Sequence, residues 1–74
     1  MKKLSELSIG DSGVIDSILD SGLSQKLLEM GCTPGEKVRV VRQAPFEGPI
    51  AILISSYMLS LRKDDAQSIM IKID

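Results

Sequence analysis

The sequence predicts a mostly-β domain, a small antiparallel barrel of about five short strands with one short α-helix between the first and second strands. Apolar and polar residues alternate along several short runs, which is typical of half-buried strands. One run has the three-to-four-residue apolar spacing of a helix instead. Glycine, proline or serine separates most of these runs, so the connections are tight. A chain of 74 residues is predicted to form one domain, residues 1–74.

The first predicted strand covers residues 14–18, and the helix follows it directly. Asp20 and Ser24 are both candidate caps, because their side-chain oxygens accept a backbone N–H at a helix start. The helix is only about two turns long, so packing against the barrel must hold it in place. One apolar stripe is available for that packing, formed by Leu23, Leu27 and Met30.

The segment after this stripe contains the predicted determinants of the fold. Gly31 follows the last apolar residue of the helix, where glycine adopts a left-handed conformation without a Cβ clash. Pro34 and Gly35 suit the middle of a type II turn, since proline fixes φ and glycine accepts a positive φ. The chain is therefore expected to switch from helix to strand within a few residues.

The remaining strands are predicted over residues 37–42, 50–54, 57–62 and 69–73. The run at 50–54 is apolar at every position, which predicts a strand covered on both sides, or bent so that both faces meet apolar neighbours. Ser55 and Ser56 form the predicted hairpin turn after it. Residues 64–67 are interpreted as one helical turn that begins with a carboxylate cap.

Short strands, tight turns and an early helix favour an SH3-like barrel. An OB-type barrel is the alternative, although it usually has longer strands and a later helix. Stability must come from the aliphatic core, because a single Cys32 excludes an internal disulfide. Without histidine, a structural zinc site is also implausible.

The free thiol of Cys32 and the lack of an export signal favour a protein of the cytoplasm. The formal net charge is −1, with nine basic and ten acidic residues. No apolar run approaches the roughly 20 residues that span a bilayer, and the first residues lack the apolar stretch of a signal peptide.

A basic arc suited to nucleic acid is conceivable, but a solvated face is favoured for these residues: Lys37, Arg39, Arg42, Arg62 and Lys63.

Searches for catalytic and metal-binding patterns predict a chain that is not an enzyme and holds no cofactor. No phosphate-binding GxxxxGK[ST] motif is present, and no catalytic triad can form without histidine. Asp64 and Asp65 are the only adjacent carboxylates, and a capping or surface role is favoured over a metal site. Cys32 is expected to pack as a small hydrophobic residue.

Surface recognition is therefore the expected activity. Phe46 is the only phenylalanine and lies among turn-forming residues, so it is a candidate anchor for a partner protein. The alternative is that Phe46 folds back to plug one end of the barrel. The predicted partner-binding residues are Phe46, Glu47, Lys26, Glu29 and Tyr57, although Tyr57 also fits the edge of the core and the helix residues fit a solvated face.

With this pattern laid out, the chain resembles the FeoA family, the small SH3-like proteins of bacterial ferrous iron uptake. The resemblance covers nearly the full length. Its carriers, in order along the chain, are Leu4-x-x-Leu7-x-x-Gly10, Leu28-x-Met30-Gly31-x-x-Pro34-Gly35, Ala44-Pro45 with Gly48-Pro49-Ile50, and Leu59-x-Leu61-Arg62 with Ala66-x-x-Ile69.

Two departures from the family pattern concern local structure. Cys32 stands where members commonly have an aliphatic residue, which the fold should tolerate. Ser56 stands where members often have glycine before the residue that matches Tyr57. If a positive φ is required there, Ser56 is strained or the turn differs.

The resemblance implies an accessory role beside FeoB, the membrane protein that carries a cytosolic GTPase and the iron pathway. The expected partner is that GTPase part, with recruitment to the inner face of the membrane. The rival interpretation is a small barrel that binds a transition metal such as ferrous iron, or nucleic acid, like the terminal domain of iron-responsive repressors. Self-association through exposed edge strands is a third hypothesis.

Overall fold

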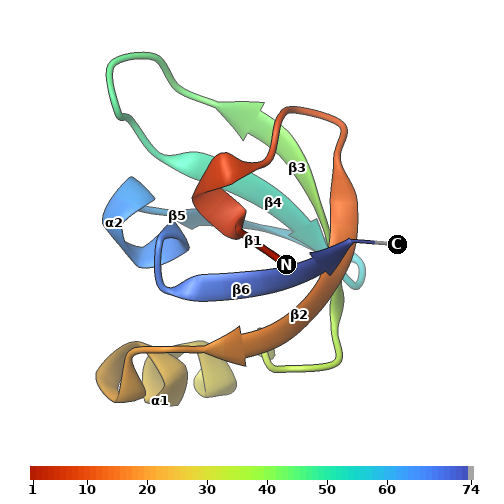
Figure 1. Ribbon diagram of the computed structural model, residues 1–74, viewed down its shortest axis with the longest axis vertical. Coiled ribbons are helices and arrows are strands. Elements are labelled where there is room, and N and C mark those ends of the chain that lie inside the picture. The colour runs from red at the N-terminus through yellow and green to blue at the C-terminus, as the bar shows by residue number, and fades with distance from the viewer. Residues whose placement is uncertain (74) are drawn as a thin grey trace.

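A computed structural model describes residues 1–73 of the chain. Short strands make up most of the described chain, and three short helical segments lie between them (Figure 1). All five predicted strands and the helix between the first two are confirmed. In chain order the elements are β1 (Lys2–Lys3), the 3-10 helix η1 (Leu4–Glu6), β2 (Ser12–Ile18), α1 (Ser21–Glu29), β3 (Lys37–Gln43), β4 (Ile50–Ile54), β5 (Tyr57–Leu61), α2 (Lys63–Ala66) and β6 (Ile69–Ile73).

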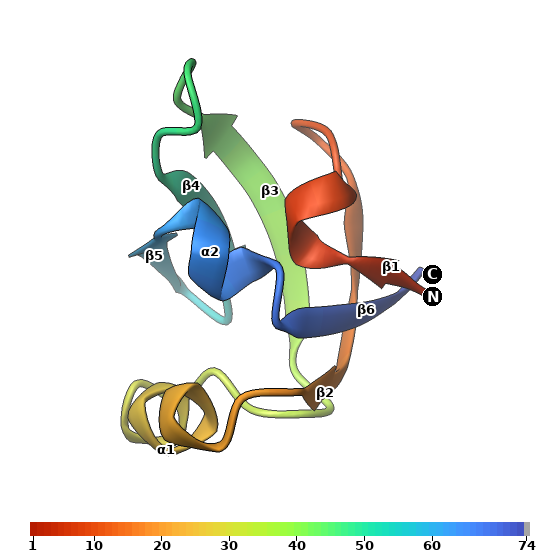
Figure 2. The ribbon, with the colours of Figure 1, turned by 60° about the vertical axis from the view of Figure 1, so that its left-hand side comes forward.

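Within residues 1–73, one antiparallel sheet contains every strand, in the order β1-β6-β2-β3-β4-β5. β3, β4 and β5 form a meander, in which Val40 pairs with Ile52 and Ile52 pairs with Leu59. The sheet curls into the predicted SH3-like barrel, with α2 between β5 and β6 (Figure 2). Among the described helices, none is long and apolar enough to cross a membrane.

The N-terminal segment adds elements that the sequence pattern does not predict. Lys2 pairs with Ile71 and Lys3 with Met70, which makes β1 a short edge strand beside β6. This pairing brings the two ends of the described chain side by side (Figure 2). η1 follows at once and places Leu4 in the core, at 1% exposure. Two lysines carry no apolar alternation, so only the available edge of β6 makes them a strand.

Both predicted signals of α1 are present. Of the two candidate caps, Asp20 is the N-cap residue, and its Oδ1 accepts the backbone N–H of Leu23 at 2.9 Å. At the other end Gly31 has a φ of 78°. The N–H of Cys32 donates to the Leu27 carbonyl at 2.9 Å, and that of Gly31 to the Leu28 carbonyl at 3.1 Å. These two bonds form a Schellman motif, which closes the helix.

The predicted Pro-Gly turn is also confirmed. The N–H of Glu36 donates to the Thr33 carbonyl at 3.1 Å, and Gly35 has a φ of 96°. A bond from residue i+3 to residue i with a left-handed glycine at i+2 matches the expected type II turn. The chain therefore passes from α1 into β3 through two glycines in left-handed conformations.

The core is aliphatic and lies inside the curled sheet. α1 contributes Leu23 and Leu27, and the strands contribute most of the other large buried side chains, among them Ile15, Val38, Val40, Ile52, Ile54, Ile69 and Ile71. The prediction of two-sided cover for the run at 50–54 is wrong. Ile50, Ile52 and Ile54 are buried, but Leu53 is 39% exposed, because one face of β4 is the outer face of the barrel.

Two local expectations after β4 need correction. α2 begins at Lys63 with Arg62 at the N-cap position and no capping side chain, so Asp64 does not cap it. Asp64 and Asp65 lie in the first turn instead, where carboxylates interact favourably with the helix dipole. In the β4–β5 hairpin the positive φ, 53°, falls on Ser55 rather than on Ser56.

α1 lies along β5, the outer strand of the sheet opposite β1. The hydroxyl of Tyr57, at the start of β5, donates to the carbonyl of Met30 at the end of α1. At the other end of the strand, Arg62 lines a surface hollow together with Leu23 and Lys26 of α1. A helix beside an edge strand hinders strand pairing, as does a two-residue edge of lysines. Neither edge therefore favours the hypothesis of self-association.

Candidate functional site

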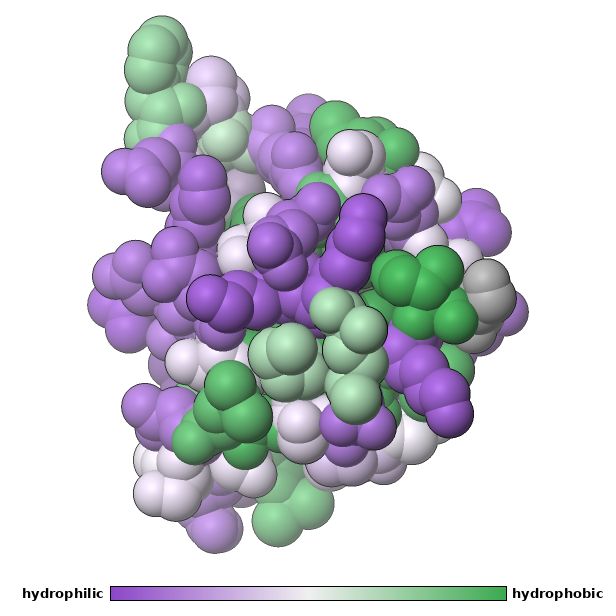
Figure 3. Space-filling model, in the orientation of Figure 1, coloured by the Kyte–Doolittle hydropathy of each residue, from purple (hydrophilic) through white to green (hydrophobic). Residues whose placement is uncertain are grey.

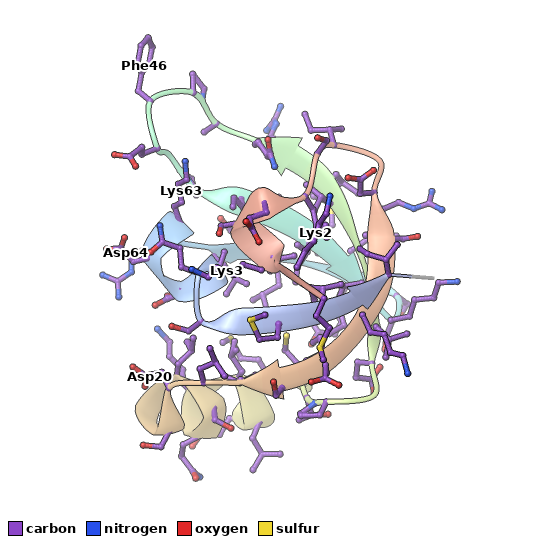
Figure 4. All side chains as sticks on the ribbon, viewed as in Figure 1. Lys2, Lys3, Asp20, Phe46, Lys63 and Asp64 are labelled. Carbon is purple, nitrogen blue, oxygen red and sulfur yellow. The ribbon has the colours of Figure 1, made fainter. Side chains whose placement is uncertain are left out.

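The loop between β3 and β4 projects from the barrel and carries Phe46 at its tip (Figure 4). The Phe46 side chain is 100% exposed. Burial in the end of the barrel, the alternative derived from the sequence, is therefore wrong. The loop is closed at its base, where the N–H of Ala44 donates to the Pro49 carbonyl at 3.0 Å. The position of Phe46 is consistent with the anchor role predicted from the sequence.

The backbone of this loop adopts a conformation that glycine usually takes. Phe46 has a φ of 57° and Glu47 a φ of 60°, two consecutive left-handed residues with side chains. Each such residue costs roughly 1–2 kcal/mol. Gly48 is held close to the start of the loop, since a Cβ there would lie 2.5 Å from the Ala44 Cβ. Backbone strain of this kind is often found at functional sites.

A hollow of about 430 Å³ lies between this loop and the start of α2. Lys63 lines this hollow, and its Nζ lies 4.0 Å from Oε1 of Glu47. Hydrophobic surface at the loop tip stands above hydrophilic surface along this edge of the molecule (Figure 3). The residues that line the hollow are Glu47, Gly48, Pro49, Arg62, Lys63 and Asp64.

A second, smaller hollow of about 230 Å³ continues this surface toward α1. Arg62 lines both hollows, and Lys26 lines the second. Arg62 also lies 3.6 Å from Asp65, measured from Nε to Oδ2. The Phe46 loop, α2 and the first half of α1 thus form one continuous rim, with Asp20 at its α1 end (Figure 4).

The structure groups only some of the residues predicted to bind a partner. Phe46 and Glu47 lie together on the loop, whereas Lys26 lines the second hollow and is linked to the loop only through Arg62, which lines both hollows. Tyr57 and Glu29 lie at the opposite end of α1, where Tyr57 is 40% exposed and bonded to Met30. The rim also includes Arg62 and Lys63, which the sequence grouped only with a diffuse basic arc. Their position beside the loop depends on tertiary packing and has no local signal.

The chemistry of the site suits recognition by charge and apolar contact. Among residues 1–73, no three histidine, cysteine, aspartate or glutamate side chains are grouped as metal ligands. Cys32 is fully buried in the core, as expected for a packing role. Burial, with a smaller contribution from the nearby Glu36 carboxylate, raises the pKa of its thiol to about 11.

The FeoA domain model matches residues 2–73 of the chain. A relative from Porphyromonas gingivalis, an Fe(2+) transport protein A/Fe(2+) transporter FeoB fusion protein, is 39% identical over 72 residues. That alignment covers 96% of this chain and 8% of the fusion protein, so the chain spans a small part of this curated relative.

Solved structures agree with this assignment. A crystal structure of an iron uptake regulatory protein, FeoA, is 36% identical, with a TM-score of 0.83 over 95% of this chain and 92% of its own. FeoA of Stenotrophomonas maltophilia complexed with zinc, a prokaryotic SH3 domain protein, is 27% identical, with a TM-score of 0.83 over 97% and 91%. A manganese-dependent transcriptional repressor matches 97% of this chain with 41% of its own, at a TM-score of 0.88. Its 24% identity makes this a likeness of fold alone. The match over residues 2–73, together with the fusion relative, places the chain in the FeoA family.

Proposed function

We propose that this domain acts in ferrous iron transport as a non-enzymatic module that binds the cytosolic GTPase part of a FeoB-type transporter. The observation that carries this proposal is the relative in which a matching domain and FeoB are fused in one chain. Fusion keeps two modules at a high effective concentration, which favours an intramolecular contact. The proposal places the domain in the cytoplasm, at the inner face of the membrane.

The contact surface we propose is the rim formed by the Phe46 loop, α2 and α1. Phe46 supplies an exposed aromatic side chain on a loop closed by two backbone bonds, so little ordering is needed on binding. Aromatic anchors of this kind are enriched among the residues that dominate interface energy. The two hollows along the rim are lined by basic residues (Lys26, Arg62 and Lys63) and by acidic ones (Asp20, Glu47, Asp64 and Asp65), so the rim favours a partner surface that carries charges of both signs.

Regulation requires that the domain distinguish two states of the GTPase. A module shifts a conformational equilibrium only as far as its affinities for the two states differ. We therefore expect the affinity for the GTPase domain to change between the GDP-bound form and the form bound to a GTP analogue. The sign of that change decides whether the module favours or opposes the active state.

Titration calorimetry of the domain against the isolated GTPase part, in each nucleotide state, tests this proposal. Phe46→Ala should weaken binding by about tenfold or more, as for an interface hot spot. Its thermal unfolding should stay within about 0.5 kcal/mol of wild type, because the side chain makes no core contact.

Ile73→Ala is the matched control, since Ile73 is half exposed and lies at the end of β6 beside the termini, away from the loop (Figure 1). It should leave the affinity unchanged. Absence of binding in every nucleotide state at about 100 µM would contradict the proposal. Anaerobic calorimetry with ferrous iron tests the rival metal-binding role, and a DNA titration at several salt concentrations tests the rival nucleic-acid-binding role.

A further inference from the structure

The outer face of the sheet carries a row of side chains that runs across four strands. Ser12 of β2 pairs with Arg39 of β3, Arg39 pairs with Leu53 of β4, and Leu53 pairs with Met58 of β5. Directly paired residues on neighbouring strands project from the same face of a sheet. Leu53 is 39% exposed and Met58 61% exposed, so this row presents two apolar side chains next to an arginine.

A β-bulge brings a second arginine to the same face. The inward positions Val38 and Val40 imply, by simple alternation, that Arg42 also points inward. The register shifts between Val40 and Arg42, however, so that Arg42 pairs with Ala51 and shares the outward face with it. A bulge inserts one extra residue and re-aims the side chains that follow. Arg42 is accordingly exposed, like Arg39.

The charge immediately around the two arginines is of one sign. The outward positions paired around the two arginines are Ser12, Ala51, Leu53, Met58 and Ser60, none of which is acidic. Within residues 1–73, neither Arg39 nor Arg42 forms an ion pair. This contrasts with the rim, where Arg62 and Lys63 both lie near carboxylates. Arg39 also borders a hollow of about 330 Å³, which Leu53 and Ser12 help to line.

We propose that this outer face docks an acidic segment of a partner protein. Carboxylates of the segment pair with Arg39 and Arg42, whose guanidinium groups bind a carboxylate through two parallel hydrogen bonds. An aliphatic side chain of the same segment covers Leu53 and Met58. This surface is separate from the rim around Phe46, and the inference does not depend on the proposed function.

Two other classes of partner fit these observations less well. Each basic residue contributes about 1 kcal/mol to binding at an anionic membrane surface, so two arginines alone would attach the domain only weakly. Single-stranded nucleic acid is held by stacking on aromatic side chains, and none lies among the outward positions of this row. An acidic protein segment uses both the charge and the apolar pair.

The test is an NMR titration of the intact domain with a synthetic hexapeptide, EELIEE, blocked at both ends. We expect saturable shifts in amides of β3, β4 and β5 near Arg39 and Leu53. The double variant Arg39→Gln/Arg42→Gln should lose at least about tenfold in affinity, since charged hydrogen bonds contribute most of the binding. The peptide QQLIQQ should not bind.

Lys2→Gln/Lys3→Gln is the matched control, because it removes the same charge from exposed residues on β1. It should leave the affinity unchanged. Equal loss in both double variants, or shifts that map elsewhere, would overturn the proposal in favour of unspecific attraction. So would absence of shifts up to about 1 mM peptide. Tighter binding of phosphatidylglycerol vesicles or of single-stranded DNA than of EELIEE, lost in Arg39→Gln/Arg42→Gln, would assign the face to a membrane or nucleic acid instead. No arm contains the GTPase, so failure here leaves the proposed function unaffected.

Discussion

The two connections that flank β3 place different residue types at their left-handed backbone positions. Before β3, the turn from Thr33 to Glu36 gives its left-handed position to Gly35, next to buried Cys32. After β3, the loop from Ala44 to Pro49 gives two left-handed positions to Phe46 and Glu47. The backbone of the first connection is free of steric strain, and the connection adjoins the buried core residue Cys32. The second is strained and holds an aromatic side chain in solvent.

The contrast separates positions that maintain the fold from positions available for function. Glycine removes the steric cost of a positive φ, so the turn before β3 stabilises the barrel. Phenylalanine and glutamate keep that cost in the loop after β3, and no burial of Phe46 compensates for it. Selection for stability alone would place glycine there. The strained loop therefore supports a role in recognition.

The largest expected effect comes from the core beneath both connections. Ile52 is fully buried and pairs with Val40 of β3 and Leu59 of β5. Ile52→Ala should cost roughly 2–5 kcal/mol, most of the stability of so small a domain. Chemical denaturation monitored by circular dichroism should show one early transition in which both connections are lost together. A turn that stayed ordered while the loop melted would break this expectation of cooperativity.

Alkaline pH should weaken the connection before β3 through Cys32. The folded pKa of its thiol is raised from 9.0 to about 11, so the unfolded chain loses this proton first as the pH rises. Stability is therefore retained below pH 9 and falls between pH 9 and 11, by on the order of 2 kcal/mol at pH 11.

Cys32→Val is the control, since it keeps an apolar side chain of similar size without a titrating group. The difference in urea midpoint between wild type and this variant should change across pH 9–11 and stay constant below. A constant difference at all pH values would show that Cys32 does not titrate in this way.

Exchanging glycine between the two connections should give effects of opposite sign. Gly35→Ala meets no atom within 4 Å but keeps a φ of 96°, so it should destabilise the domain by about 1 kcal/mol. Glu47→Gly relieves the strain at a φ of 60° and should stabilise the domain by up to about 1 kcal/mol. Its ion pair with Lys63 at 4.0 Å is exposed and contributes little. Thermal unfolding of both variants measures these two changes in stability. Changes of the same sign would show that the two connections do not differ in backbone strain.

Local sequence signals predicted the connection before β3 because each residue there acts through its own backbone. Gly31, Pro34 and Gly35 adopt the conformations that their chemistry favours, and the strand alternation of Val38 and Val40 matches their burial. The same reasoning failed where the partner strand decides the outcome. Lys2 and Lys3 form a strand only because β6 offers an edge with which they can pair.

The candidate site was only partly predictable for a related reason. Turn-forming residues around Phe46 indicate a loop but do not determine whether its tip folds inward. Arg62 and Lys63 follow β5 in sequence, and only the packing of α2 beside the loop makes them its neighbours. Leu53 looked buried because its run is apolar throughout, yet it lies on the outer face. Each of these facts belongs to tertiary structure.

The pairing of β1 with β6 has a consequence for how this domain is joined to other proteins. Because Lys2 lies opposite Ile71, the polypeptide enters and leaves the barrel at neighbouring positions on one edge of the sheet. A domain with adjacent chain ends is suited to insertion into a longer polypeptide or to circular permutation, since neither requires the barrel to open. The junction lies away from the Phe46 loop (Figure 1), so a host protein attached there would leave the loop unobstructed.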